Sequence, residues 1–126
     1  LSKDFANQIQ IKGLLSNDAQ INNIVANSDL IVNTTPVGMS TTSTYEENIL
    51  PYGEAFWTSL TSKTTVYDLI YNPAPTSLLK LANKRGCTTI DGTQMLIAQG
   101  AKSLSFWTNG LEVPFHIMYD AVKKYL

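Results

Sequence analysis

The sequence predicts an α/β domain in which a doubly wound parallel sheet of about four strands is flanked by helices. Three short runs rich in β-branched and aliphatic residues, at residues 30–32, 64–71 and 88–90, have the composition of buried strands. Segments with helical periodicity lie between them, and strands that alternate with helices form parallel sheets. The length of 126 residues suits one such unit.

The first quarter of the chain supplies two helices and two strands in this prediction. Residues 2–8 are expected to form a short helix, and the alternating apolar residues at 9–14 an edge strand. Residues 17–26 follow as a helix, because an Asn-Asp pair at its start can cap it. The continuous apolar run at 30–32 is typical of a strand that is covered on both faces.

The middle of the chain is predicted to alternate between loop, helix and strand. Residues 40–52 are polar and show no periodicity, which indicates a loop. A helical turn at 54–60 packs two aromatic side chains, and residues 64–71 form the next buried strand. Two prolines, Pro73 and Pro75, then enforce an extended loop.

Helices dominate the last third. Thr76 or Ser77 caps a helix that Gly86 ends, and the strand at 88–90 leads into a helix at 93–107. At 100° per residue, one broad apolar arc of that helix faces the core, formed by Leu96, Ile97, Ala101, Leu104 and Trp107.

A turn at 108–110 separates this helix from the last one. Pro114 suits the first turn of a final helix that reaches Tyr125. The single histidine, His116, falls on the polar side of that helix, so we expect it at the surface and expect no histidine-based metal site.

Composition excludes several classes of function. The net charge of −1 gives no basic footprint for nucleic acid or for an anionic membrane. No run approaches the roughly 20 apolar residues that span a bilayer, and no signal-peptide pattern is present, so a cytoplasmic location is expected. Cys87 is the single cysteine, which excludes an internal disulfide and a cysteine-rich metal site and favours a buried thiol.

Polar residues follow the first buried strand where a ligand would bind. In open α/β sheets, ligands lie beyond the carboxyl ends of the strands. Asn33, Thr34 and Thr35 stand at such an end, followed by a Pro-x-Gly turn. Their amide and hydroxyl groups could bond a ribose, a phosphate or a carboxamide, although the same residues also build ordinary polar turns.

The second buried strand ends in a similar way. A flat ring could pack on Leu69, and the hydroxyl of Tyr71 could contact a polar substrate. The competing interpretation places Leu69 and Ile70 in the core with Tyr71 at its rim. Asp68 lies just before them, and we expect it to organise the loop through backbone hydrogen bonds rather than to act as a catalytic acid.

A third candidate lies on the helix at 93–107. Met95 and Gln99 share a face that differs from the apolar arc. Gln99 could make a two-point hydrogen bond to a polyol or a carboxylate, or it could simply face solvent.

The ordered set of motifs resembles the carboxyl-terminal half of shikimate dehydrogenases. That family carries (I/V)VN(T/A)T-x-x-G(M), then (Y/F)D-x-x-Y-x-P-x-x-T, then DG-x-x-ML-x-x-Q(G/A)A with F-x-x-W beyond. The matching segments here are residues 32–39, 67–76 and 91–101, followed by Phe106 and Trp107. The resemblance extends over roughly residues 29–125.

The resemblance implies a Rossmann-like fold and reversible, NADP-dependent reduction of 3-dehydroshikimate to shikimate. It places Tyr71 and Gln99 at the substrate. It places a second set along the cofactor: Asn33, Thr34, Thr35, Leu69, Gly92 and Met95. Residues 1–110 then form an incomplete NADP-binding domain, and residues 111–126 a helix that completes the interdomain region.

Several family features have no counterpart in the chain. The family's Ser-x-Ser clamp, its catalytic Lys and Asp, the glycine-rich phosphate turn and the basic 2′-phosphate motif are missing. The chain also begins with Leu1 rather than Met. We therefore expect a part of a longer enzyme that has no catalytic residue of its own, is inactive alone, and exposes apolar surface that favours self-association.

Two other functions stay open at this stage. One is a related dehydrogenase that uses quinate or NAD, because the deciding residues of the family lie outside the chain. The other is a non-catalytic module in which a truncated nucleotide fold binds a partner.

Overall fold

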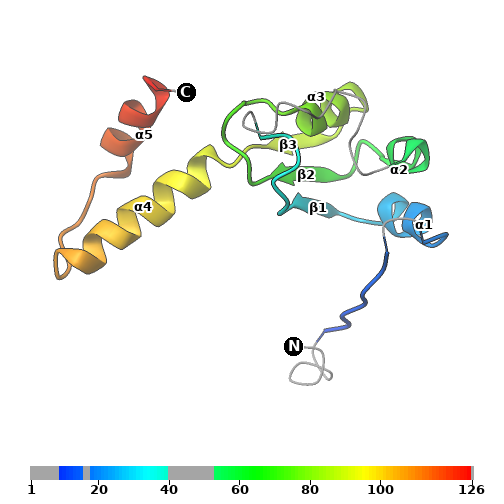
Figure 1. The fold of residues 1–126 in the computed structure, drawn as a ribbon, viewed down its shortest axis with the longest axis horizontal. Helices are drawn as coiled ribbons and strands as arrows, with labels where there is room; N and C mark the ends of the chain where they lie inside the picture. The colour runs from blue at the N-terminus through cyan, green and yellow to red at the C-terminus, as the bar shows by residue number, and fades with distance from the viewer. Residues whose placement is uncertain (1–8, 16–17, 40–52, 126) are drawn as a thin grey trace.

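Three parallel strands form the centre of the molecule (Figure 1). The computed structural model describes residues 9–15, 18–39 and 53–125. The strands lie side by side in the order β1-β2-β3, with the bounds Leu30–Asn33 for β1, Thr65–Asp68 for β2 and Thr88–Ile90 for β3. The expected α/β class with a parallel sheet is confirmed.

The register brings the carboxyl ends of the strands to one edge. Leu30 pairs with Thr65, and Asn33 pairs with Asp68 at the last position of both strands. Tyr67 of β2 pairs with Ile90, the last residue of β3. All three strands therefore deliver their following loops to the same side of the molecule.

Five helices accompany the sheet in the described part of the chain. They are α1 (Ile21–Ala26), α2 (Glu54–Ser59), α3 (Ser77–Lys84), α4 (Thr93–Trp107) and α5 (Phe115–Lys123). Helix α3 packs on β2 and β3, while α1 and α2 pack on each other. Helix α4 leads away from the sheet, and α5 turns back and packs on α4 (Figure 1).

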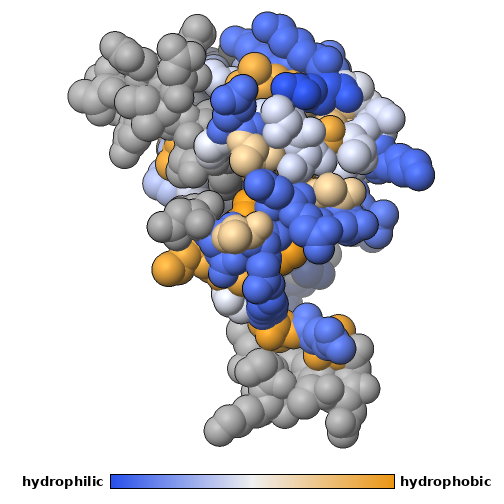
Figure 2. Space-filling view, turned by 90° about the vertical axis from the view of Figure 1, so that its right-hand side faces the viewer, coloured by the Kyte–Doolittle hydropathy of each residue, from blue (hydrophilic) through white to orange (hydrophobic). Residues whose placement is uncertain are grey.

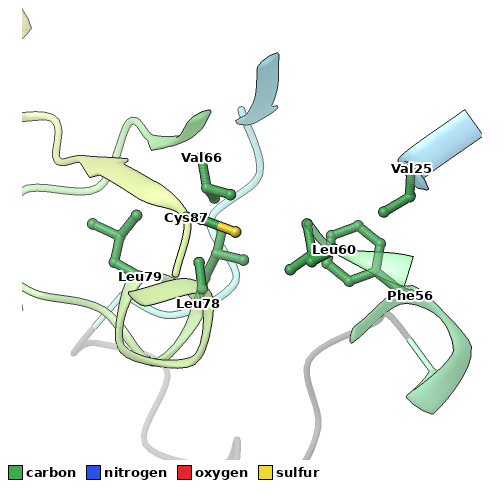
Figure 3. Packing of buried hydrophobic residues seen from close by; sticks show 8 residues of the cluster. Val25, Phe56, Leu60, Val66, Leu78, Leu79 and Cys87 are labelled. Carbon is green, nitrogen blue, oxygen red and sulfur yellow. The ribbon is translucent and has the colours of Figure 1, made fainter. Parts of the chain in front are cut away.

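The main core lies between the sheet and the helices α1, α2 and α3. Figure 3 shows Val66, Cys87, Leu78 and Leu79 on one side and a group from α1 and α2 on the other. Val66 and Ala82 are fully buried. The predicted burial of Cys87 is confirmed.

The helix at 77–84 begins and ends as its sequence predicts. The hydroxyl of Thr76 accepts a hydrogen bond from the Leu79 N–H at 3.3 Å, so Thr76 is the N-cap. Gly86 follows the helix with a φ of +81°, a conformation that glycine adopts without steric cost. The bounds predicted for the helix at 93–107 are also confirmed.

Two predictions about strands are wrong. Residues 9–14 form no strand: Ile9 and Ile11 are about half exposed, and the described residues offer no neighbour that pairs with them. The first buried strand is not covered on both faces, because Leu30 is 56% and Val32 41% exposed.

The second strand is shorter than predicted. It ends at Asp68 rather than at residue 71, because its neighbour β1 ends at the paired Asn33. Beyond that point the Ile70 N–H turns to the Asp68 side chain. The backbone N–H of Ile70 therefore stabilises the loop instead of bonding a neighbouring strand.

The helices need two corrections. The helix predicted at 17–26 begins at Ile21, because the Asp18 carboxylate bonds the Gln20 N–H in a turn that precedes the helix. In the predicted apolar arc of α4, Ile97 alone is buried, whereas Trp107 is 77% exposed. Most of α4 extends past the sheet, so its arc has no core to face (Figure 1).

Some predictions fall outside the described residues, namely the helix at 2–8 and the loop at 40–52. None of the helices described is long and apolar enough to cross a membrane.

Candidate functional site

The turn after β1 is organised by one buried amide. Asn33 is 3% exposed. Its Oδ1 accepts hydrogen bonds from the Thr35 N–H at 3.1 Å and from the Thr35 hydroxyl at 2.7 Å. Its Nδ2 donates to the Val37 carbonyl at 3.4 Å. Asn33 thus fixes the turn from below, while Thr34 and Thr35 remain exposed above it.

A glycine lets the chain reverse directly after this turn. The Met39 N–H donates to the Pro36 carbonyl at 3.1 Å, and Gly38 between them has a φ of +105°. A turn with positive φ at its third residue favours glycine. A Cβ at Gly38 would stand 3.5 Å from Ile70, so the turn lies against the loop that follows β2.

The segment after β2 runs beside the first turn. The Leu69 N–H donates to the Asn33 carbonyl at 3.1 Å, which extends the contact between the two strands by one residue. Ile70 is buried, whereas Tyr71 is 37% exposed. The tyrosine therefore stands at a rim, as one of the two sequence interpretations expected.

A cavity of about 450 Å³ opens between these two segments. It brings together four of the predicted site residues, Thr34, Thr35, Leu69 and Tyr71. Sequence reasoning did not assign the other lining residues to the site; they are Pro36, Met39, Ile70 and Asn72. All four belong to the two motifs at 32–39 and 67–76. Their membership in these motifs was therefore the signal that could have predicted them as lining residues.

The chemistry of the lining is mainly apolar with a few hydroxyl groups. Such a surface suits a flat ring with polar substituents. Among the described residues that line the cavity, Tyr71 is the one with an ionisable side chain. In the part of the chain that the structure describes, no cluster of His, Cys, Asp and Glu could hold a metal ion.

Gly92 joins the third motif to this site. A Cβ built on Gly92 would lie 2.0 Å from the Leu69 carbonyl oxygen, far inside any allowed contact. The Gly92 N–H donates to the Ile70 carbonyl at 3.1 Å. The start of α4 is therefore held against the backbone of the pocket wall, and only glycine fits there.

The two remaining predicted residues lie farther along α4. Met95 is half-buried, and Gln99 is exposed one helical turn later. Neither belongs to the lining of the cavity at Leu69 and Tyr71. The structure thus gathers four predicted residues in the cavity, places Asn33 beneath it and Gly92 beside it, and leaves Met95 and Gln99 outside.

Asp68 connects the walls from inside. It is fully buried, and its carboxylate accepts hydrogen bonds from Asn33, Ile70 and Thr76. The expected structural role of this residue is confirmed, with side-chain donors as well as the backbone.

Proteins of similar sequence carry the name of the family that the motifs resemble. Residues 92–123 match the family model described as the Shikimate 5'-dehydrogenase C-terminal domain. A protein named shikimate dehydrogenase (NADP(+)) from Prochlorococcus marinus (strain MIT 9312) is 69% identical over all 126 residues, which are 44% of that relative's length. The chain spans less than half the length of the curated relatives that it matches.

Solved structures are similar over most of the chain. A shikimate 5-dehydrogenase from Listeria monocytogenes, in complex with shikimate and NAD, is 28% identical to this chain with a TM-score of 0.73. The likeness covers 95% of this chain and 40% of that one. A quinate dehydrogenase from Corynebacterium glutamicum, in complex with NAD, is 35% identical with a TM-score of 0.65 over 82% and 34%. The motifs, the fold and these likenesses agree: over its whole length the chain is similar to the carboxyl-terminal part of shikimate dehydrogenases.

Proposed function

We propose that the chain forms one wall of an active site that reduces 3-dehydroshikimate reversibly to shikimate with NADPH. The observation that carries this proposal is the cavity at the carboxyl ends of β1 and β2, where two family motifs meet. The name of the Prochlorococcus relative supports NADP as cofactor, and the bound shikimate of the Listeria enzyme supports the substrate class.

The residues of the cavity fit the nicotinamide end of NADP. Leu69 and Ile70 offer an apolar wall for a flat ring, and Thr34 and Thr35 offer exposed hydroxyl groups. When bound, NADPH supplies a hydride to the carbonyl carbon of the substrate. Because the described residues of the lining include no Lys or Arg, we propose that the 2′-phosphate is held by residues outside this cavity.

The roles proposed for single residues follow the family motifs. Tyr71 and Gln99 contact the substrate. A second set lies along the cofactor: Asn33, Thr34, Thr35, Leu69, Gly92 and Met95. Residues 1–110 serve nucleotide binding, residues 111–126 belong to the interdomain region, and the enzyme works in the cytoplasm.

The chain does not supply the proton that the reaction requires. Reduction of a ketone needs a hydride and also a general acid near the new hydroxyl oxygen. The part of the lining that the structure describes holds one ionisable side chain, the phenol of Tyr71, which we assign to substrate binding. We therefore propose that the acid comes from the rest of the enzyme and that these 126 residues alone are inactive.

A chimera tests the proposal directly. This chain replaces the matching 126 residues of the Prochlorococcus marinus (strain MIT 9312) relative, and shikimate-dependent reduction of NADP is followed by absorbance. We expect the chimera to be active and the isolated chain to be inactive. A chimera that is folded but inactive would favour a non-catalytic module instead.

Variants of the chimera separate the two proposed sets of residues. Tyr71→Phe and Gln99→Ala are expected to raise KM for shikimate by about tenfold and to leave KM for NADP nearly unchanged, since each removes a substrate hydrogen bond. Ser103→Ala, an exposed change on the same helix as Gln99, is the matched control.

The likeness to a quinate dehydrogenase with bound NAD favours a second candidate, oxidation of quinate with NAD. Both acids and both cofactors are therefore assayed on the chimera and on the parental Prochlorococcus enzyme. A gain of quinate turnover relative to the parent would come from this chain and would favour the second candidate.

A further inference from the structure

We propose that Asp68 is a positioning residue that holds the two walls of the cavity in their working arrangement. The walls are the turn at Asn33–Thr35 and the segment Leu69–Tyr71. The inference rests on the proposed function of this cavity as the cofactor and substrate site.

Asp68 is fully buried, and its hydrogen-bond donors among the described residues, Asn33, Ile70 and Thr76, are uncharged. Its Oδ1 accepts from Asn33 Nδ2 at 3.0 Å and from the Ile70 N–H at 3.1 Å. Its Oδ2 accepts from the Thr76 hydroxyl at 2.7 Å. One carboxylate thus joins the end of β1, the loop after β2 and the N-terminus of α3.

The carboxylate determines which way the Asn33 amide points. The Oδ1 atom of Asp68 is an acceptor that already takes the Ile70 N–H, so Asn33 turns its NH₂ group toward it. Its oxygen is then directed at Thr35, whose N–H and hydroxyl both donate to it. If the amide were reversed, its NH₂ group would face the Thr35 N–H, and the turn would lose that bond.

The same oxygen of Asp68 fixes the opposite wall. The Ile70 N–H would have no strand to pair with, because β2 ends at Asp68. Bonding to Asp68 directs Ile70 into the cavity lining, and the Ile70 carbonyl receives the Gly92 N–H on the other side. Asp68 itself does not line the cavity, so it acts through Asn33 and Ile70.

Three variants of the chimera test this role. Asp68→Ala removes the acceptor from all three donors. Asp68→Asn keeps one oxygen for Asn33 and Ile70 and presents an NH₂ group to the Thr76 hydroxyl, which can accept. Leu78→Ala is the matched control, because Leu78 is 1% exposed in the core and lies outside the cavity lining.

We expect Asp68→Ala to raise KM for NADP by about tenfold, and Asp68→Asn to restore it to within about twofold. Leu78→Ala is expected to lower the melting temperature at least as much and to leave KM for NADP within about twofold. Equal effects of Asp68→Ala and Leu78→Ala on KM would overturn the proposal, because Asp68 would then matter for stability alone.

A second measurement decides the proposal independently of activity. Asp68 bonds Asn33, Ile70 and Thr76 but not Thr35. Faster hydrogen exchange of the Thr35 amide in Asp68→Ala, absent from Leu78→Ala, would therefore show that the orientation of Asn33 is lost. Unchanged hydrogen exchange at the Thr35 amide would contradict the proposal that Asp68 orients the turn through Asn33. An inactive unsubstituted chimera rejects the proposed function, whereas the exchange experiment still decides the role of Asp68.

Should Asp68→Ala fail to fold, Asp68→Ser takes its place. A serine hydroxyl can donate as well as accept, so it no longer dictates the direction of the Asn33 amide. The same shifts in KM and in Thr35 exchange are expected, and their absence in a folded Asp68→Ser chimera would overturn the proposal.

Discussion

Gly92 carries the sharpest steric constraint among the described glycines. Its N–H bonds the Ile70 carbonyl, and its missing Cβ would stand 2.0 Å from the Leu69 oxygen. The atoms that this Cβ would meet are the carbonyl oxygen and carbon of Leu69 and the carbonyl carbon of Ile70. Because they belong to the backbone, no side-chain rotation can relieve the clash. Gly92→Ala must separate the start of α4 from the pocket wall.

We expect Gly92→Ala to destabilise the chimera by about 2–4 kcal/mol and to weaken binding of NADP, as read from chemical unfolding and from KM. Gly100→Ala on the same helix is the control. Its Cβ would meet only the flexible end of Met118 at 3.1 Å, and alanine gains helix propensity. If Gly92→Ala were as stable as Gly100→Ala, the close approach at Leu69 would be refuted.

Cys87 gives a prediction that depends on pH. Burial raises the pKa of its thiol above the ordinary value, with a smaller opposing effect from a backbone hydrogen bond. The folded state then keeps a proton that the unfolded state loses, so its stabilising effect is full below the thiol's ordinary pKa and is lost as pH rises through the higher, folded value.

The measurement compares unfolding midpoints near neutral pH and about one unit above the ordinary thiol pKa of about 8.5. The unsubstituted chimera is expected to lose stability over this interval, and Cys87→Ala to lose less. Identical losses in both proteins would mean that other groups control the alkaline limit.

At the scale of single residues, sequence reasoning predicted positions but not hydrogen-bond partners. It assigned Asp68 to loop structure and placed Thr34, Thr35, Leu69 and Tyr71 at one edge, where the structure gathers them. The bond between Asn33 and Asp68 joins residues 35 apart in the sequence. No local pattern contains such a pairing, because it depends on the register of two strands.

Among the secondary-structure elements, α3 shows how a helix start can serve a site at a distance. The Thr76 hydroxyl accepts from the Leu79 N–H and donates to Asp68. Thr76→Val removes both bonds while it keeps the shape, so we expect a loss of about 2–4 kcal/mol. Thr76→Ser keeps the hydroxyl and is expected to lose less than about 1 kcal/mol.

Urea unfolding of the chimera measures both variants of Thr76 against the unsubstituted protein. Equal stability of Thr76→Val and Thr76→Ser would show that the hydroxyl contributes little, and would also weaken the place of Thr76 in the Asp68 network.

Elements with local signals were predicted well, and those that need a neighbour were not. The cap at Thr76 and the turn at Gly86 define α3 without reference to the rest of the chain. A strand instead exists through its partner. Residues 9–14 have the alternation of a strand but none to pair with in the described structure, and β2 stops where β1 stops.

The distribution of apolar surface distinguishes the two ends of the whole molecule. Figure 2 shows a mainly hydrophilic face with smaller hydrophobic areas at the end where α1 and α2 lie. At the other end, α4, α5 and the loop between them expose large side chains: Phe106 at 83%, Trp107 at 77%, Leu111 at 60% and Ile117 at 58%. The sequence placed Trp107 in a core, because helical periodicity identifies an apolar face but not what covers it.

That exposed end leads us to expect concentration-dependent self-association of the isolated chain. Apolar patches larger than a few hundred Å² are rare on monomers, because water favours their burial against another surface. Sedimentation velocity over a concentration series should show larger species, and the double variant Trp107→Lys with Ile117→Lys should shift them toward monomer. Leu15→Lys, at a residue that is 75% exposed outside α4 and α5, is the control. A chain that stays monomeric throughout, or that Leu15→Lys disperses equally well, would show that α4 and α5 do not form the contact.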